Sequence, residues 1–228
     1  MFVVTGAARG IGREVVRRLR GEGHRVAGLL RAGGSRMPTD ALDARLELEL
    51  SRPDELAAAL AAFAADLGPV EGLVHSAGVV RGGDLQHTTA ADYTLQFAVN
   101  VTAVAEITRA LLPNLRQAAG TVVLVNSGSG LTARTPLGGY AASKFALRAY
   151  ADSLRQEEPG IRVSSIYPGR VATDMQVEVR MLEGAEYRPE EYLEVGTVAE
   201  AVLTVLRLPS DGTITDLTLR PWTGRGHG

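Results

Sequence analysis

The chain contains a single lysine, Lys144, which stands four residues after Tyr140. The chain has 24 lysines and arginines in total, and all of them except Lys144 are arginine. Arginine carries its charge on a broad planar fork, whereas lysine carries it as a compact point on a flexible stem, so the two are not interchangeable. A lysine that remains where arginine serves everywhere else indicates a place that needs a compact cation.

Tyr140 and Lys144 have the i, i+4 spacing that places two side chains on one face of a helix. A free tyrosine has a pKa of about 10 and is a poor acid or base at neutral pH. A cation about 4 Å away would stabilise the ionised form by about 4 kcal/mol at an effective dielectric of about 20. We therefore predict that Lys144 lowers the pKa of Tyr140 and makes it a proton-transfer catalyst.

Ser127 lies thirteen residues before Tyr140 and follows the apolar run 122–125. That run reads as a buried strand, which puts Ser127 at the carboxyl end of the strand, where open α/β sheets bind their ligands. A hydroxyl in this position can hold a substrate oxygen for Tyr140, and Ser129 is a second possible donor.

A glycine-rich turn follows the first predicted strand and opens the first predicted helix, with the sequence Thr5-Gly6-Ala7-Ala8-Arg9-Gly10-Ile11-Gly12. Glycines let such a turn bend sharply and approach a pyrophosphate, and the helix N-terminus offers free N–H groups to it. The context of strand, turn and helix is the one that dinucleotide binding requires.

Charge at the end of the second predicted strand indicates which nucleotide this turn binds. An acidic residue there would bind a ribose 2′-hydroxyl, whereas a basic residue favours a 2′-phosphate. The strand here ends in Arg31, and in this type of fold Arg9 of the glycine-rich turn is expected to point to the same corner. We predict NADP(H) as the cofactor and regard NAD(H) as the weaker alternative.

Short β-rich runs alternate with longer helical patterns along the whole chain. Strands are expected at 2–5, 25–30, 45–50, 72–75, 121–126, 162–167 and 213–219, and helices at 11–20, 54–67, 140–157 and 197–206, with a loop over 31–39. The stretch 90–117 is expected to be helical and to consist of two helices. Such alternation predicts an α/β fold, a Rossmann-type, doubly wound and mostly parallel sheet with helices on both faces. No linker or internal repeat interrupts it, so residues 1–228 are expected to form one domain.

The segment 175–196 differs from the rest of the chain. It contains six glutamates and two tyrosines and shows no clear period. It is either a mobile lid over a site or a surface excursion, and we favour the lid.

Composition excludes several classes of protein. The net charge is −2, without a lysine- or arginine-dense run, which argues against nucleic-acid binding. The absence of cysteine excludes disulfides and thiolate catalysis, and the four scattered histidines (His24, His75, His87 and His227) lack metal-ligand spacing. No apolar stretch approaches the roughly 18 residues of a membrane span, and the N-terminus shows no signal-peptide pattern. We expect a cytoplasmic protein without a bound metal or a membrane partner.

Taken together, these motifs resemble the short-chain dehydrogenase/reductase family of the standard single-domain type. They fall in the family's order, span essentially the whole chain and are Thr5-Gly6-x-x-x-Gly10-x-Gly12, Ser76-Ala77-Gly78, Asn100, Ser127, Tyr140-x-x-x-Lys144 and Pro168-Gly169. The resemblance implies an oxidoreductase in which a hydride moves between nicotinamide and a carbonyl or alcohol carbon.

The resemblance also assigns roles to single residues. Tyr140 would be the general acid/base, Ser127 would orient the substrate oxygen, and Lys144 would lower the tyrosine pKa and hold the nicotinamide ribose. Asn100 would anchor a water that links Lys144 to solvent. The cofactor would also meet a further set of residues, namely Gly6, Arg9, Gly10, Ile11, Gly12, Arg31, Ala77, Gly78, Pro168, Gly169 and Thr173.

Two positions depart from the family pattern. His75 and Ser76 stand where the family usually has two asparagines, so the structural hydrogen bonds of the first asparagine are in question. Glu49 stands near the position of an aspartate that usually touches adenine. The stretch after Arg31 is also short, so the usual helix before the third strand is expected to be reduced or missing.

The favoured hypothesis is an NADP-dependent oxidoreductase acting on a small carbonyl or alcohol compound, assembled as a homodimer or homotetramer through its two long helices. The alternative is a catalytically silent NADP-binding sensor or scaffold of the same fold, and an epimerase or dehydratase of the related extended family is a third reading. Residues expected to shape a partly apolar substrate pocket are Val79, Leu131, Pro136, Tyr167, Met175, Val177, Val179, Met181 and Leu182.

Overall fold

A computed structural model describes residues 1–34 and 41–222 of the chain. Residues 35–39 of the loop expected at 31–39 therefore lie outside the described residues, as does His227. The described part is built on one seven-stranded sheet with the strand order β3-β2-β1-β4-β5-β6-β7. All of its neighbouring strands run parallel.

The strands of this sheet are short and mostly apolar. They are β1 (Phe2–Thr5), β2 (Val26–Arg31), β3 (Ala44–Leu48), β4 (Gly72–His75), β5 (Thr121–Val125), β6 (Arg162–Pro168) and β7 (Asp216–Leu219). Every residue of β1, β4 and β5 is buried, as expected for a sheet covered on both faces. The predicted strands are confirmed, although β7 begins three residues later than expected.

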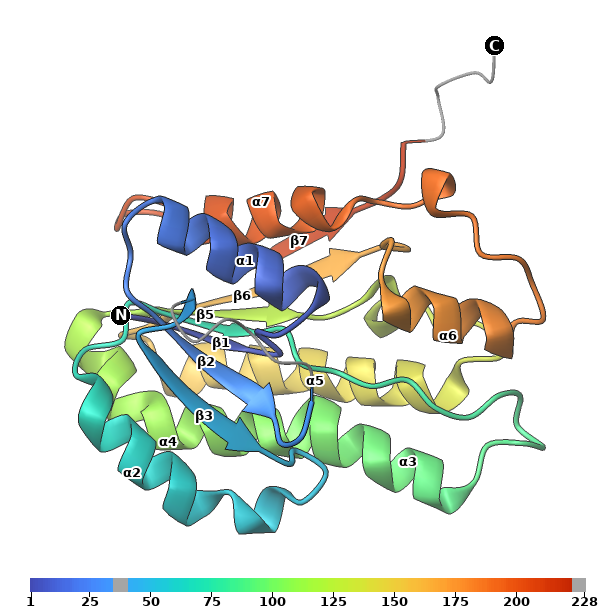
Figure 1. Ribbon diagram of the computed structural model, residues 1–228, viewed down its shortest axis with the longest axis horizontal. Coiled ribbons are helices and arrows are strands. Elements are labelled where there is room, and N and C mark those ends of the chain that lie inside the picture. Colours follow the sequence, from blue (N-terminus) through green and yellow to red (C-terminus); the bar gives the residue numbers. More distant parts are fainter. Residues whose placement is uncertain (35–40, 223–228) are drawn as a thin grey trace.

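Helices cover both faces of the sheet in two layers (Figure 1). One face carries α1 (Gly10–Gly21) and α7 (Val195–Leu206), which pack against each other. The other face carries α2 (Ala57–Leu67), α3 (Ala90–Phe97), α4 (Ala103–Ala118) and α5 (Gly138–Glu157). The predicted doubly wound α/β fold is confirmed.

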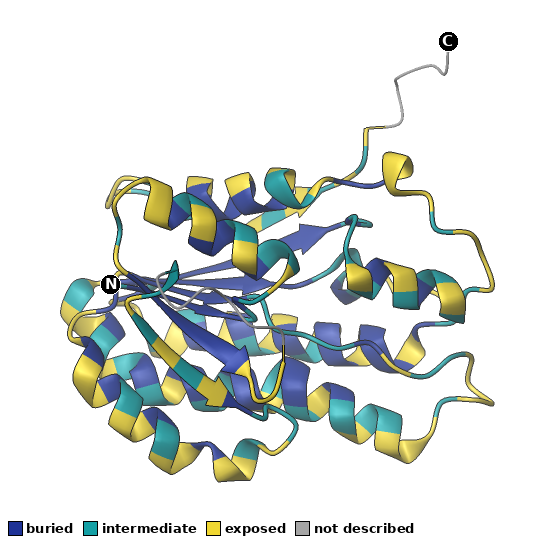
Figure 2. Ribbon diagram, viewed as in Figure 1, coloured by how far each residue is buried: buried dark blue, intermediate teal, exposed yellow. Residues whose placement is uncertain are grey.

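Each face of the sheet has its own apolar cluster. Val15, Leu19 and Val202 belong to the cluster beneath α1 and α7, whereas Leu60, Ile107 and Leu147 belong to the cluster on the opposite face. Figure 2 shows the buried central strands between helices whose outer faces are exposed. These two clusters fix the strands and therefore the positions of the loops at their carboxyl ends.

Several details differ from the sequence predictions or add to them. A 3₁₀ turn, Pro53–Glu55, precedes α2, so the helix proper starts later than expected. The long helical stretch expected over 90–117 is α3 and α4 joined by a π-helical segment, Ala98–Thr102. In the described residues between β2 and β3, 32–34 and 41–43, no α-helix is present. The segment 175–196, for which no period was found, contains α6 (Asp174–Leu182) and a 3₁₀ turn, Pro189–Glu191.

The helical run Ala90–Ala118 has 29 residues and contains an 18-residue window with a mean hydropathy of 1.2, enough by length and composition to cross a membrane. The expectation that no stretch approaches such a length was therefore wrong. In the structure Val104, Ile107, Leu111 and Leu115 of this run are buried against the sheet. A helix of the protein core accounts for its apolar character.

Candidate active site

A cleft of about 850 Å³ opens at the carboxyl ends of the strands. It is lined by the glycine-rich turn at one end and by the residues that follow β5 at the other. Strand order reverses between β1 and β4, and such a switch point is where open α/β sheets bind ligands. All fifteen residues named as catalytic or cofactor-binding in the sequence line this cleft except Gly12 and Asn100.

Gly12 and Asn100 support the cleft from behind. A Cβ at Gly12 would lie 2.4 Å from the Gly6 carbonyl oxygen, so only glycine lets α1 pack this closely on the turn. Gly6 itself has φ +65, and a Cβ there would lie 2.9 Å from the backbone nitrogen of Ala77. The glycines therefore shape the turn and bring it against the backbone that follows β4.

The N-terminus of α1 is suited to an anion. Its N-cap residue, Arg9, makes no side-chain capping bond, and its first turn contains no acidic residue. The amide groups of this turn are left for a partner with negative charge, which the helix dipole also favours. These features fit the pyrophosphate of a dinucleotide.

Tyr140 and Lys144 lie side by side on α5, which begins at Gly138. The Lys144 Nζ atom is 5.7 Å from the centre of the Tyr140 ring and donates a hydrogen bond to the Val125 carbonyl oxygen at 3.1 Å. Both side chains are more than nine-tenths buried. The predicted juxtaposition on one helix face is present.

The ionisation of this pair differs from the prediction. Burial raises the pKa of Tyr140 to about 12, and interaction with the Ser127 side chain opposes that rise. Burial also lowers the pKa of Lys144 to about 8, which leaves it mostly charged at neutral pH. A cation about 6 Å from a tyrosinate stabilises it by about 3 kcal/mol at an effective dielectric of about 20, and the Lys144 Nζ atom lies 5.7 Å from the centre of the Tyr140 ring. Lys144 thus offsets part of the effect of burial and does not bring Tyr140 close to neutrality by itself.

Ser127 is oriented by the 3₁₀ turn that follows it, Gly128–Gly130. Its hydroxyl oxygen accepts a hydrogen bond from the Ser129 backbone nitrogen at 3.1 Å. The hydroxyl proton remains for another acceptor, such as a substrate oxygen. Ser129 also lines the cleft, and its backbone nitrogen is the donor of this hydrogen bond to Ser127.

Asn100 lies in the π-helical segment and is fully buried. Its side chain accepts from the Val79 nitrogen at 2.9 Å and donates to the Val79 oxygen and the Ser143 hydroxyl, each at 3.0 Å. A Cβ at Gly78 would lie 3.3 Å from the Asn100 Oδ1 atom and 3.9 Å from the Lys144 Nζ atom. Asn100 therefore fixes the backbone beside Lys144, and π-helical segments of this kind are frequent at functional sites.

His75, the first position that departs from the family pattern, is buried and makes a hydrogen bond inside the protein. Its Nε2 atom lies 2.9 Å from the Thr108 hydroxyl, which itself donates to the Val104 carbonyl. The histidine therefore donates from Nε2 and is neutral, and burial lowers its pKa to about 3. It is a structural residue behind the cleft.

Glu49 reaches the cofactor end of the cleft. Its Oε2 atom lies 3.6 Å from the Arg31 Nε atom. Hydrogen bonds from the Ser51 side chain and backbone lower the pKa of Glu49. The carboxylate at this corner thus offsets the charge of Arg31, which the sequence alone did not show.

Three ion pairs tie α6 and the residue after it to the walls of the cleft. Asp174 lies 3.5 Å from Arg9, Glu178 lies 2.9 Å from Arg81, and Glu183 makes a two-bond contact of 2.8 and 2.9 Å with Arg170. Thr173 caps the helix by accepting from the Gln176 nitrogen. Sequence reasoning identified Arg9 but not Arg81 and Arg170, nor Arg220 and Gln176, which also line the cleft.

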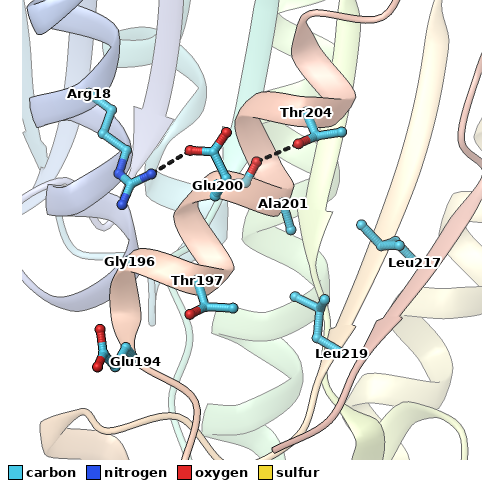
Figure 3. Close-up of a pocket in the computed structure, with 9 residues that line it drawn as sticks. All are labelled: Arg18, Glu194, Gly196, Thr197, Glu200, Ala201, Thr204, Leu217 and Leu219. Carbon is cyan, nitrogen blue, oxygen red and sulfur yellow. Dashed lines mark hydrogen bonds and ion pairs between the residues drawn. The ribbon is translucent and has the colours of Figure 1, made fainter. Parts of the chain in front are cut away.

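A second depression of about 590 Å³ lies between α7 and β7 and shares no lining residue with the cleft (Figure 3). Its charged residue Arg18 is paired with Glu200 at 2.5 Å and with Glu14 at 2.8 Å. Among the described residues, no group of three histidine, aspartate or glutamate side chains is placed to hold a metal ion. The cleft is therefore the candidate active site.

Comparison with known proteins agrees with this geometry. The family model described as short chain dehydrogenase matches residues 1–183, and the chain belongs to the short-chain dehydrogenase/reductase family. A 3-alpha-(or 20-beta)-hydroxysteroid dehydrogenase of Mycobacterium tuberculosis is 30% identical over 209 residues, covering 88% of this chain and 77% of that protein. Human dehydrogenase/reductase SDR family member 11 is 28% identical, covering 97% of this chain and 94% of that protein.

Among solved structures, the alcohol dehydrogenase from the archaeon Thermococcus sibiricus, complexed with 5-hydroxy-NADP, has a TM-score of 0.82 and 25% sequence identity. The match covers 99% of this chain and 98% of that one. The protein is thus an NAD(P)-dependent oxidoreductase that acts on a CH–OH or C=O group of a small molecule.

Proposed function

We propose that the protein catalyses the NADPH-dependent reduction of a carbonyl compound, and the reverse oxidation of the alcohol, with Tyr140 as the general acid/base. The observation that carries this proposal is the burial of Tyr140 and Lys144 together on α5, beside the hydroxyl of Ser127. When bound, the cofactor supplies a hydride to the carbonyl carbon. A proton must then reach the carbonyl oxygen for the alcohol to form.

The residues of the chain divide this proton transfer between them. Ser127 donates its free hydroxyl proton in a hydrogen bond to the substrate oxygen and so holds it near Tyr140. Tyr140 gives its phenolic proton to that oxygen. The charge of Lys144 stabilises the tyrosinate that remains until a solvent proton restores it. The anchoring of a water by Asn100 belongs to the same proposal.

The cofactor would lie along the cleft from the glycine-rich turn to the residues after β6. Gly6, Gly10, Ile11 and the N-terminus of α1 would hold the pyrophosphate. Tyr140, Lys144 and Ala77-Gly78 would meet its ribose and adenosine parts. Pro168, Gly169 and Thr173 would contact the nicotinamide side.

NADP(H) is favoured over NAD(H) because two arginines, Arg9 and Arg31, line the glycine-rich end of the cleft, and arginine suits phosphate by geometry and by charge. The Thermococcus sibiricus relative in complex with a modified NADP supports the same choice. Glu49 acts against it, since its carboxylate lies beside Arg31 and would attract a ribose hydroxyl instead.

One domain spanning residues 1–228 would carry both the cofactor site and the substrate site. The segment Met175–Gly196 would serve as a lid over the substrate. The ion pairs of Glu178 with Arg81 and Glu183 with Arg170 support this part of the proposal, because they join the segment to the walls of the cleft. Asp174, the residue just before the segment, pairs with Arg9 in the same way. If the segment is a lid, NADPH should slow hydrogen–deuterium exchange in residues 174–196. Unchanged exchange there would refute the lid.

Two exposed phenylalanines, Phe97 and Phe145, support a homodimer or homotetramer, because they lie on α3 and α5, which pack together. Light scattering that shows a monomer at micromolar concentration would contradict this assembly. A cytoplasmic location is part of the same proposal and can be tested by cell fractionation.

The oxidoreductase proposal is tested by following NADPH absorbance with a panel of ketones and aldehydes, with NADH as the comparison. Consumption of NADPH with at least one carbonyl compound is expected. Tight NADPH binding without consumption over a broad panel would instead favour a silent sensor or scaffold.

A further inference from the structure

The side chain of Arg220 is held next to the residue that follows Ser127. Its Nη1 atom donates to the backbone oxygens of Tyr167 and Leu219, each at 3.0 Å. Its Nη1, Nη2 and Cζ atoms lie 3.3, 3.4 and 3.5 Å from the point where a Cβ of Gly128 would be. The guanidinium is thus packed on a glycine and fixed by two carbonyls, within the lining of the cleft.

The remaining donors of Arg220 have no acceptor within residues 1–34 and 41–222. Only its Nη1 atom makes hydrogen bonds there, and no carboxylate of the described chain forms an ion pair with it. Arg170, on the same wall of the cleft, differs because Glu183 neutralises it with two hydrogen bonds. Arg220 therefore presents an oriented positive charge, with its Nε and Nη2 atoms available to a ligand.

The cofactor's 2′-phosphate does not account for this charge. That phosphate is expected beside Arg31, at the end of β2, whereas Gly128 follows β5. Three strand spacings separate β2 from β5 in the sheet, which is roughly 14 Å at about 4.8 Å per spacing. The guanidinium of Arg220 lies at the substrate end of the cleft, one residue from Ser127.

We propose that Arg220 binds a carboxylate of the substrate, so that the enzyme acts on short oxo acids and the corresponding hydroxy acids. Arginine recognises a carboxylate through two parallel N–H donors, and Ser127 would hold the carbonyl oxygen of the same molecule. Because Ser127 and Gly128 are adjacent, with Cα atoms about 3.8 Å apart, the carboxylate and the carbonyl must be only a few bonds from each other. This inference rests on the proposed function and names the substrate class for it.

The test compares 2-, 3- and 4-oxo acids with their methyl esters, in which the charge is absent and the carbonyl is retained. The wild-type enzyme should have a kcat/KM about 10- to 100-fold higher for the preferred acid than for its ester, the value of a charge-assisted hydrogen bond. Arg220→Gln should lose that factor for the acid, mostly through KM, and change the ester less than about threefold. Arg220→Lys should retain part of the preference, and Arg45→Gln, at an exposed position on β3, should leave it unchanged.

Gly128 provides an independent check of the contact. A methyl group at this position would lie 3.3–3.5 Å from the guanidinium and would crowd it. Gly128→Ala should therefore lower the acid-to-ester ratio of the wild type and leave the ratio of Arg220→Gln unchanged. An equal effect of Gly128→Ala in both backgrounds would contradict the contact.

The inference and the proposed function fail in different ways. Equal turnover of acids and esters, or an Arg220→Gln variant that loses both equally, would overturn the carboxylate site and leave the oxidoreductase standing. If no compound is turned over, titration calorimetry of the protein saturated with NADP⁺ measures whether an oxo acid binds. Binding of an oxo acid that Arg220→Gln abolishes would support the site, and absence of binding for every acid would overturn it.

Discussion

The buried histidine at the end of β4 makes the stability of the protein depend on pH in a way that can be calculated. His75 donates from Nε2 to Thr108, and its Nδ1 atom is buried without a partner among the described residues. A second proton would have to be added at Nδ1, where no acceptor faces it. Burial accordingly lowers the pKa of His75 from 6.5 to about 3.

A histidine whose pKa is lower in the folded chain binds protons preferentially in the unfolded chain. Stability is therefore retained above the unfolded-state pKa of 6.5 and is lost progressively as the pH falls towards the folded-state value of about 3. Between pH 7.5 and pH 5, His75 alone should reduce the free energy of unfolding by about 2 kcal/mol. At pH 5 this result hardly depends on the folded-state value, because folded His75 is still neutral there.

The assay is urea denaturation of the wild type and His75→Asn at pH 7.5 and pH 5. The variant keeps a side chain that can bond to Thr108 but does not titrate, so its loss of stability on acidification should be smaller by about 2 kcal/mol. His87→Asn, at an exposed position, should change that loss by less than about 0.5 kcal/mol. An equal loss of stability in His75→Asn and the wild type would refute the neutral buried histidine.

Four further substitutions test other parts of the cleft. Lys144→Met removes an interaction of about 3 kcal/mol with the tyrosinate and should slow turnover about 100-fold. Lys144→Arg should fold normally and also lose most activity, because the guanidinium has the wrong shape. A fully active Lys144→Arg enzyme would contradict this. Glu49→Gln removes the carboxylate 3.6 Å from Arg31 and should raise the preference for NADPH over NADH by about three- to tenfold in fluorescence titrations; an unchanged preference would place the 2′-phosphate elsewhere. Gln176→Met removes a buried amide nitrogen without a partner among the described residues and should raise the free energy of unfolding by about 1 kcal/mol; a less stable variant would show that the amide is satisfied.

The sequence predicted the fold well where a single physical signal dominates. Apolar runs such as Val122–Val125 are the central strands, and the glycine-rich turn with its helix was found because only glycine permits its backbone contacts. The helix α6 was missed because only Gln176 and Val179 of it are buried, too few to give a periodic apolar face. A capping signal was nevertheless present, since Thr173 stands three residues before Gln176 and caps the helix.

The candidate site was predicted in its parts and less well in its electrostatics. The positions of Tyr140, Lys144 and Ser127 follow from helix spacing and strand ends, which are local properties. The pKa values depend on burial, and burial is set by the whole fold, so the estimate from Lys144 alone gave too large an effect on Tyr140. The contact of Arg220 with Gly128 joins residues far apart in the chain, and no local pattern marks it.

The central claim is that Tyr140 supplies the proton in an NADPH-dependent carbonyl reduction, and Tyr140→Phe tests it most directly. The phenyl ring keeps the packing with Val80 and Val179 and loses only the hydroxyl. With the best substrate from the carbonyl panel, kcat should fall by about 10²- to 10⁴-fold, while the dissociation constant for NADPH should change less than about threefold. A Tyr140→Phe enzyme that keeps more than about a tenth of the wild-type kcat would contradict the assignment.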